Sequence, residues 1–204
     1  MAESIVQINE GSGKKLHTFQ RVIGANTVED EVIIFGENYL ASYTVAIGSI
    51  STATAASHVI QIMAGASLKV RIRRIELWLN IPATAAALAL VDVLRLTTAG
   101  TGGTVVTPGV LDPGDAASGA TAMTLPTVKG TEGTLICRAE PYMLQTVAAS
   151  MSTFGPLVVW DFDRPRSKPL IIAAGATNGI CVKWGTAIAA GAITGTVWID
   201  ESNF

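Results

Sequence analysis

The chain has 204 residues, of which 49% are hydrophobic and only 15% are Asp, Glu, Lys or Arg, against about 25% charged residues in a typical soluble domain. Its formal net charge of −2 argues against broad nucleic-acid binding, because a protein that neutralises several phosphates carries a basic stripe. The most apolar run, residues 83–94, contains Asp92 and is too short for a membrane-spanning helix. We therefore expect neither nucleic acid nor membrane as a partner.

The low charge also predicts what covers the surface of the protein. Burying Thr, Ala or Gly costs less free energy than desolvating an unpaired charge, and the cores of protein interfaces are depleted of charged residues. The composition therefore favours a protein that associates with copies of itself or with other proteins. A secreted β-sandwich that works alone is the alternative.

Residues 1–50 are predicted to form an extended N-terminal arm that bears short strands. The Gly-Ser-Gly segment 11–13 is typical of a flexible joint, and strand-like runs follow at residues 16–23, 31–35 and 39–47. Such an arm can reach a neighbouring subunit by adding a strand to it. The contact residues expected from this region are Ile33, Phe35, Tyr39 and Tyr43.

Residues 51–204 carry the pattern of a β domain, and its most informative run is residues 68–81. Leu68, Val70 and Ile72 alternate with basic side chains, and the apolar set then slips by one position. A slip of one residue is what a β-bulge introduces, and it keeps both halves of a strand facing the core. We predict one long, bulged strand.

The remaining β domain is predicted to consist of short strands between turns. Residues 87–97 are rich in Ala and Leu, but they hold no clean helical stripe and favour a strand. Residues 99–133 are predicted to form long loops around short strands, with a turn at residues 112–115. Further strands are expected at residues 58–63, 134–138, 157–162, 170–174, 180–184 and 195–200. Short strands bounded by turns predict a jelly-roll-like antiparallel β-sandwich with an extended N-terminal arm.

No constellation for catalysis is apparent, so we expect no enzyme, no catalytic residue, no metal and no cofactor. His17 and His58 are the two histidines, and neither stands in a nucleophile or metal-binding motif. The Gly-rich segment 100–104 precedes a strand-like run instead of the helix that a phosphate site needs. Cys137 and Cys181 are expected to be free buried thiols, although their spacing leaves a disulfide open.

Two groups of charged residues are further candidate contacts between subunits. The first is the basic face of the long strand, with Lys69, Arg71 and Arg73. These side chains either protect a sheet edge or pair with acidic groups of a neighbouring subunit. The second is the loop of residues 161–168, which holds two aspartates and the basic residues Arg164, Arg166 and Lys168. This loop is expected to form local ion pairs, with a metal site as the lesser alternative.

The C-terminal segment carries a resemblance to a known class of proteins. Lys168-Pro169-Leu170-Ile171-Ile172, then residues 175–180, and finally Gly191 through Val197-Trp198-Ile199-Asp200-Glu201 resemble the closing strands of small virion proteins of tailed bacteriophages. In those proteins a jelly-roll-like domain ends in a "Pro-Leu…Asn-Gly-Ile…Gly…Trp-x-Glu" run. The resemblance covers about 35 residues, from Lys168 to Glu201, and it extends loosely to the rest of the β domain.

This resemblance implies a capsid-associated structural protein, such as a decoration or cement protein. It further implies a homo-oligomer, with a trimer favoured, bound to the major capsid protein or to other virion proteins. The location implied is the virion, assembled in the host cytoplasm, and no signal peptide is evident at the N-terminus. The alternative is a carbohydrate- or receptor-binding β-sandwich module of a phage neck or tail that uses residues 99–133. Those residues contain no aromatic side chain, which counts against a glycan site.

Overall fold

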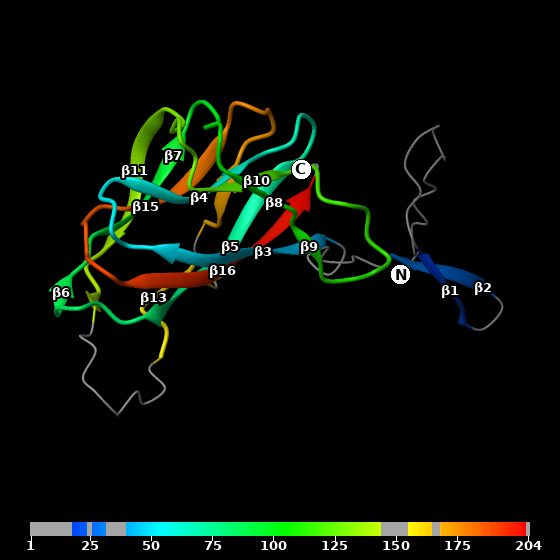
Figure 1. Ribbon diagram of the computed structural model, residues 1–204. Helices are drawn as coiled ribbons and strands as arrows, with labels where there is room; N and C mark the ends of the chain where they lie inside the picture. Colours follow the sequence, from blue (N-terminus) through cyan, green and yellow to red (C-terminus); the bar gives the residue numbers. More distant parts are fainter. Residues whose placement is uncertain (1–17, 24–25, 32–39, 144–154, 165–167, 203–204) are drawn as a thin grey trace. The chain divides into compact units, whose positions relative to one another are not determined.

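The structure is a computed structural model, and it describes residues 18–23, 26–31, 40–143, 155–164 and 168–202. The chain divides into two compact units, Met1–Tyr39 and Leu40–Phe204. In the first unit, β1 (Thr18–Ile23) and β2 (Asn26–Glu31) form an antiparallel pair (Figure 1). Of the strand expected at residues 31–35, Glu31 is described as the last residue of β2, and residues 32–35 lie outside the described residues.

The boundary between the two units falls earlier than the sequence indicated. The arm was expected to end near residue 50, but β3 (Ala41–Ser51) is a full strand of the second unit. Tyr43, Val45 and Ile47 alternate with more exposed residues and lie in the core of this unit. Their period of two buries one face of the strand, which makes β3 part of the sandwich.

The second unit is a sandwich of two antiparallel sheets with six strands each (Figure 1). The first, named here the β5 sheet, has the order β13-β5-β16-β3-β9, with β14 also paired to β5; the second, the β4 sheet, has the order β11-β7-β15-β4-β10-β8. β6 and β12 form a further, two-stranded antiparallel sheet. The bounds are β4 (Ser57–Met63), β5 (Lys69–Ile81), β6 (Ala87–Leu88), β7 (Val91–Leu96), β8 (Thr104–Val106), β9 (Gly109–Val110), β10 (Thr121–Thr124), β11 (Glu132–Ala139), β12 (Tyr142–Met143), β13 (Val158–Asp161), β14 (Leu170–Ile172), β15 (Gly179–Trp184) and β16 (Ala192–Ser202).

The pairing of the long strands is that of a jelly roll. The first of them, β3, pairs with the last, β16, and β4 pairs with β15, the last but one. Inside these, β5 pairs with β13 and β14, and β7 pairs with β11. Strands of the first half therefore meet those of the second half in reverse order, which is how a jelly roll winds two Greek keys into two sheets. The predicted jelly-roll-like sandwich is confirmed.

The predicted bulge in the long strand is confirmed as well. The register of β5 with β16 shifts where Trp198 faces Arg74 and Ile199 faces Ile72. Arg73 is therefore the additional residue in β5, and Ile75 and Val70 both face the core. The ambiguous residues 87–97 contain the strands β6 and β7, so the strand prediction holds there too.

The connection between β7 and β11, residues 97–131, is named here the insertion. It was predicted to be loops with short strands, and it contains β8, β9 and β10. β8 and β10 extend the β4 sheet, whereas β9 extends the β5 sheet. The insertion therefore adds to both layers of the sandwich. No helix of the described residues is long and apolar enough to cross a membrane.

Candidate interaction surfaces

The outer face of the β5 sheet carries the basic side chains of β5, and Asp163 neutralises two of them. Arg73 donates to Asp163 Oδ2 from Nη2 at 2.8 Å and from Nε at 3.1 Å, and Arg71 pairs with Oδ1 of the same carboxylate. Asp200 Oδ1 on β16 lies 3.7 Å from Arg73 Nη1. β5 lies between β16 and β13, so these arginines do not protect a sheet edge. They pair with acidic groups of their own chain.

A second group on the same face combines a cation with an aromatic ring. The guanidinium of Arg74 lies 5.7 Å from the centroid of the Trp198 ring, a distance at which the ring attracts a cation. Arg74 also pairs with Glu76, which is buried on β5. Trp78 on this face is exposed, whereas Trp184 lies in the core between the sheets.

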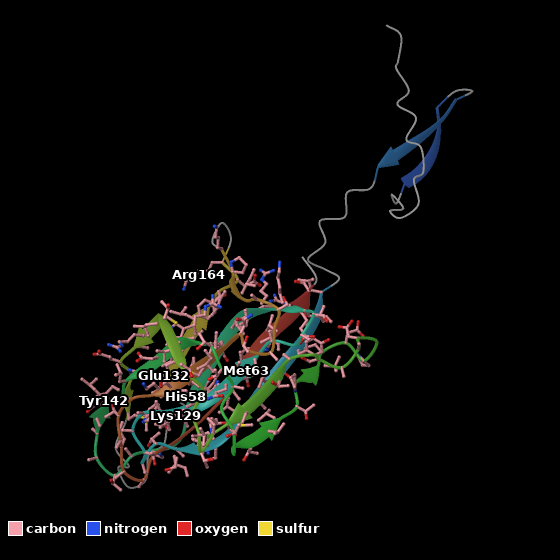
Figure 2. All side chains as sticks on the ribbon, turned by 90° about the horizontal axis from the view of Figure 1, so that it is seen from above. His58, Met63, Lys129, Glu132, Tyr142 and Arg164 are labelled. Atoms are coloured by element: carbon pink, nitrogen blue, oxygen red, sulfur yellow. The ribbon has the colours of Figure 1, made fainter. Side chains whose placement is uncertain are left out.

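The other residues expected to make contacts fall into three groups. Tyr43 is a correction: its side chain is 2% exposed in the core, and its hydroxyl donates to the carbonyl of Ala116 at 2.9 Å. Lys69 is half-buried at the start of β5, and Arg164 is exposed after β13, where Figure 2 labels it. The rest, Ile33, Phe35, Tyr39 and Arg166, lie outside the described residues.

β3 leaves part of its edge without a neighbouring strand. β9 pairs only with Tyr43 and Thr44, and no strand of the described residues pairs with residues 45–51 on the side away from β16. This stretch contains no charged residue and no proline, the two kinds of residue that usually protect an edge. Its register with β16 shifts around Gly48 and Ser49, which is a bulge. We refer to residues 45–51 as the open edge.

The insertion exposes apolar side chains beside the open edge. Val110 on β9 faces Tyr43 of β3 across the pair, and the amide of Leu111 donates to the carbonyl of Ser42 at 3.0 Å. Both side chains are exposed, Leu111 at 55%. The exposed large apolar residues of the insertion are Val105, Val110, Leu111, Leu125 and Val128, of which Val105 is the most exposed at 70%. Groups of exposed apolar residues of this kind often mark interaction sites.

A buried carboxylate holds the middle of the insertion on the sandwich. Glu201 on β16 is buried, and its Oε1 accepts from the hydroxyl of Ser118 and from the amide of Ala120, both at 2.7 Å. Its Oε2 accepts from the amide of Gly119 at 3.0 Å. Burial raises the pKa of the nearby Tyr43, and the charge of Glu201 raises it further. Within the described part of the chain, three donors and no basic side chain contact this carboxylate.

The outer face of the β4 sheet holds a buried polar network around His58, which Figure 2 labels together with Glu132. His58 on β4 has a fully buried side chain, and its Nε2 lies 2.9 Å from Glu132 Oε1. Its Nδ1 lies 2.6 Å from Gln61 Nε2. Lys183 on β15 donates to Glu132 Oε2 at 2.7 Å. Burial lowers the pKa of His58, against the effect of Glu132, which raises it.

His58 and Gln61 can meet because β4 carries a bulge. Residues three apart on a regular strand point to opposite faces. The register of β4 with β15 shifts between Ile60 and His58, so one additional residue brings the two side chains to the same face. Next to them, a small apolar cluster of Met63, Leu94, Leu96 and Cys181 is buried on this outer face. The network and the cluster lie where a sandwich usually meets water.

The two thiols are free, and their environment makes them weak nucleophiles. Burial raises the pKa of Cys181 to about 12 and that of Cys137 to about 11. Cys181 packs in the outer cluster, whereas Cys137 packs against the core between the sheets. The thiolate is the reactive form of cysteine, so neither residue suits covalent catalysis. In the described part of the chain, no three His, Cys, Asp or Glu side chains group as a metal site.

Comparison of the chain with models of known protein families, with curated proteins and with solved structures finds no match.

Sequence reasoning missed the two features that distinguish the insertion. Its exposed apolar residues lie among Gly, Thr and Pro, and only the length of the segment indicated a functional role. The His58 network joins residues from four separate segments, and a single histidine at the start of a strand gives no local signal for it. Gly100 was weighed as part of a phosphate loop, but its amide serves Gln61.

Proposed function

We propose that this protein is a non-enzymatic virion structural protein, which associates with copies of itself and binds the capsid surface as a decoration or cement protein. The observation that carries the proposal is the open edge of β3 with the exposed Val110 and Leu111 beside it. A β-strand with unpaired N–H and C=O groups is a template for another strand. Natural proteins usually protect such an edge with charges, and residues 45–51 have none.

The same residues support a second copy of this chain as the partner. A second copy of this chain brings an identical uncharged stretch, so no like charges meet when the two edges approach. The apolar side chains that flank the edge lose contact with water on association, which contributes roughly 25 cal/mol per Å² of apolar area removed from water. The main-chain hydrogen bonds of an added strand fix the register. Pairing of two identical edges closes a dimer, which can serve as a building unit of a coat.

Light scattering of the purified protein tests the self-association. We expect an oligomer at micromolar concentrations in the wild-type chain. Gly48→Lys places a charge on the open edge, where an added Cβ meets no atom within 4 Å, so the fold should tolerate it and the oligomer should weaken. Gly155→Lys is the matched control, because an added Cβ also meets no atom within 4 Å there and it adds the same charge outside the open edge. A wild-type monomer at all concentrations, or equal oligomers in both variants, contradicts the proposal.

Capsid binding is tested separately with a chain that lacks residues 1–39, the first compact unit. We infer that this arm anchors the protein, so the shortened chain should form its oligomer and no longer sediment with capsids. Undiminished sedimentation contradicts the anchoring role and leaves the edge association to its own test.

A further inference from the structure

The insertion is closed at its base by a short neck next to His58. Thr101 and Val128 form a β-bridge with amide-to-carbonyl distances of 2.8 and 3.1 Å. The hydroxyl of Thr98 accepts from the amide of Thr131 at 2.8 Å. The neck consists of residues 98–101, which include Gly100, and residues 128–131, which lead directly into Glu132. Both strands of the neck are therefore tied to the His58 network.

The hydrogen bonds of this network have only one consistent direction. The amide N–H of Gly100 can only donate, and it lies 2.8 Å from Gln61 Oε1. The side-chain amide of Gln61 therefore presents its NH₂ group to His58 Nδ1 at 2.6 Å. Nδ1 must accept, so the ring carries its one proton on Nε2 and donates it to Glu132. The neutral ring satisfies every member of this chain.

The packing around Gly100 is fitted to this arrangement. A Cβ at residue 100 would lie 2.8 Å from both Nε2 and Oε1 of Gln61, and 2.7 Å from the carbonyl oxygen of Val128. Side-chain carbons do not approach other atoms so closely. Glycine is therefore what allows the backbone of the neck to reach Gln61.

A proton on Nδ1 of His58 is incompatible with the same arrangement. Nδ1–H and the NH₂ group of Gln61 would then face each other as two donors. Rotating the Gln61 amide satisfies His58 but turns NH₂ towards the amide of Gly100, which then loses its acceptor. A buried donor without an acceptor costs about 1–3 kcal/mol. Protonation of the ring therefore either sets two donors against each other or, once Gln61 rotates to relieve this, removes the acceptor of the Gly100 amide.

The charged groups around His58 act in both directions. Glu132 on β11 favours the protonated ring, whereas Lys183 on β15 and Lys129 in the insertion disfavour it. Lys129 is held nearby by donating to the carbonyl of Ala56 at 2.9 Å. Farther along the same face, Asp92 on β7 is paired with Arg138 at 2.7 and 3.0 Å. Lys183 also pairs with Glu132, so the one carboxylate that contacts the ring is shared with a lysine.

We propose that His58 is a proton-operated latch: uptake of a proton on Nδ1 moves the Gln61 oxygen from Gly100 to His58 and releases the neck of the insertion from the β4 sheet. The rest of the sandwich stays folded, because β5, β16 and β3 take no part in the network. The insertion keeps its other attachments, which are the pairing of β10 with β4, the pairing of β9 with β3 and the contacts of residues 118–120 with Glu201. The release therefore loosens the neck and leaves residues 118–120 in place.

Hydrogen exchange of the intact protein tests the latch. Between about pH 7.5 and pH 5, the range in which histidine changes charge, protection of the Gly100 amide and of residues 128–131 should fall at least about tenfold after correction for intrinsic exchange. Protection of β5 and β16 should not change. His58→Gln should abolish the pH dependence of the neck, whereas His17→Gln, which removes the other histidine of the chain, should keep it. Gly100→Ala should give low protection of the neck at both pH values.

Nitrogen NMR of the wild-type ring provides a measurement that needs no variant. We expect the neutral ring with its proton on Nε2 at about pH 7.5, and a titration that coincides with the loss of protection at Gly100. A proton on Nδ1 at the higher pH contradicts the latch. Unchanged protection of the neck at the lower pH contradicts it equally.

Discussion

The outer faces of the two sheets differ in the contacts that other parts of the chain make with them. On the β4 sheet, the neck of the insertion is tied to a buried histidine, and an apolar cluster that includes Leu94 and Cys181 is buried beside it. On the β5 sheet, arginines of β5 meet aspartates at the surface, and Trp78 and Val159 remain exposed. The comparison teaches that ion pairs lie on both faces, whereas the buried apolar cluster lies on the β4 face.

The largest expected effect separates the two faces by truncation of an apolar side chain. Leu94 is buried at 9% exposure, and Leu94→Ala should lower the free energy of unfolding by about 2–5 kcal/mol, since the lost contacts leave a cavity. Val159→Ala on the other face should lower it by less than about 0.5 kcal/mol, as is usual for exposed positions. Denaturant unfolding measures both. Equal losses would mean that the outer face of the β4 sheet is not covered as described.

The pH dependence of stability gives a second, intermediate effect on the β4 face. Burial lowers the pKa of His58 in the folded protein, whereas the unfolded chain has the ordinary value of about 6.5. As the pH falls below about 6.5, the unfolded state therefore binds more protons than the folded state. The stability that the neutral His58 contributes is fully present above about pH 6.5. It falls as the pH drops below that value, by up to about 1.4 kcal/mol per pH unit.

Unfolding curves of the wild-type chain and of His58→Gln at a series of pH values check this slope. The part of the slope that is due to His58 should disappear in the variant. If the two chains lose stability in parallel between about pH 6.5 and pH 5, the histidine does not contribute as argued.

The smallest expected effect lies on the β5 face. Asp163→Asn removes the carboxylate that pairs with Arg71 and Arg73, and it should lower the free energy of unfolding by about 1 kcal/mol or less, because Arg73 is well exposed and water screens the pair. The loss should shrink at high salt. Asp112→Asn makes the same charge change in an exposed turn and serves as the control. A loss several times larger would show that this face depends on its ion pairs more than on packing.

Alternation of apolar residues was enough to predict most of the sandwich. Leu77 and Val70 alternate with polar neighbours, and the slip at Arg73 marked a bulge because a shift of one residue exchanges the two faces of a strand. The arm boundary was misplaced because β3 begins at Ala41 with small residues, and its alternation has no strong start signal. The first compact unit therefore ends at Tyr39.

The candidate surfaces were harder to predict, because they depend on contacts between distant segments. Nothing near Arg71 in sequence indicates Asp163 as its partner, since the pairing arises when β13 and the residues after it lie along β5. Tyr43 carries a side chain that suits an interface, but its strand position buries it. Local pattern predicts which face a residue takes, and it does not predict what lies over that face.

The attachment of residues 118–120 to Glu201 has a consequence for the biosynthesis of the protein. Glu201 lies on β16, so the ribosome must release the chain up to and beyond this residue before its carboxylate can receive its three donors. The pairing of β3 with β16 imposes the same delay on the first strand of the sandwich. A chain that stops early therefore offers neither β3 nor the insertion in the form seen here, and incomplete translation products are kept out of any assembly that selects this form.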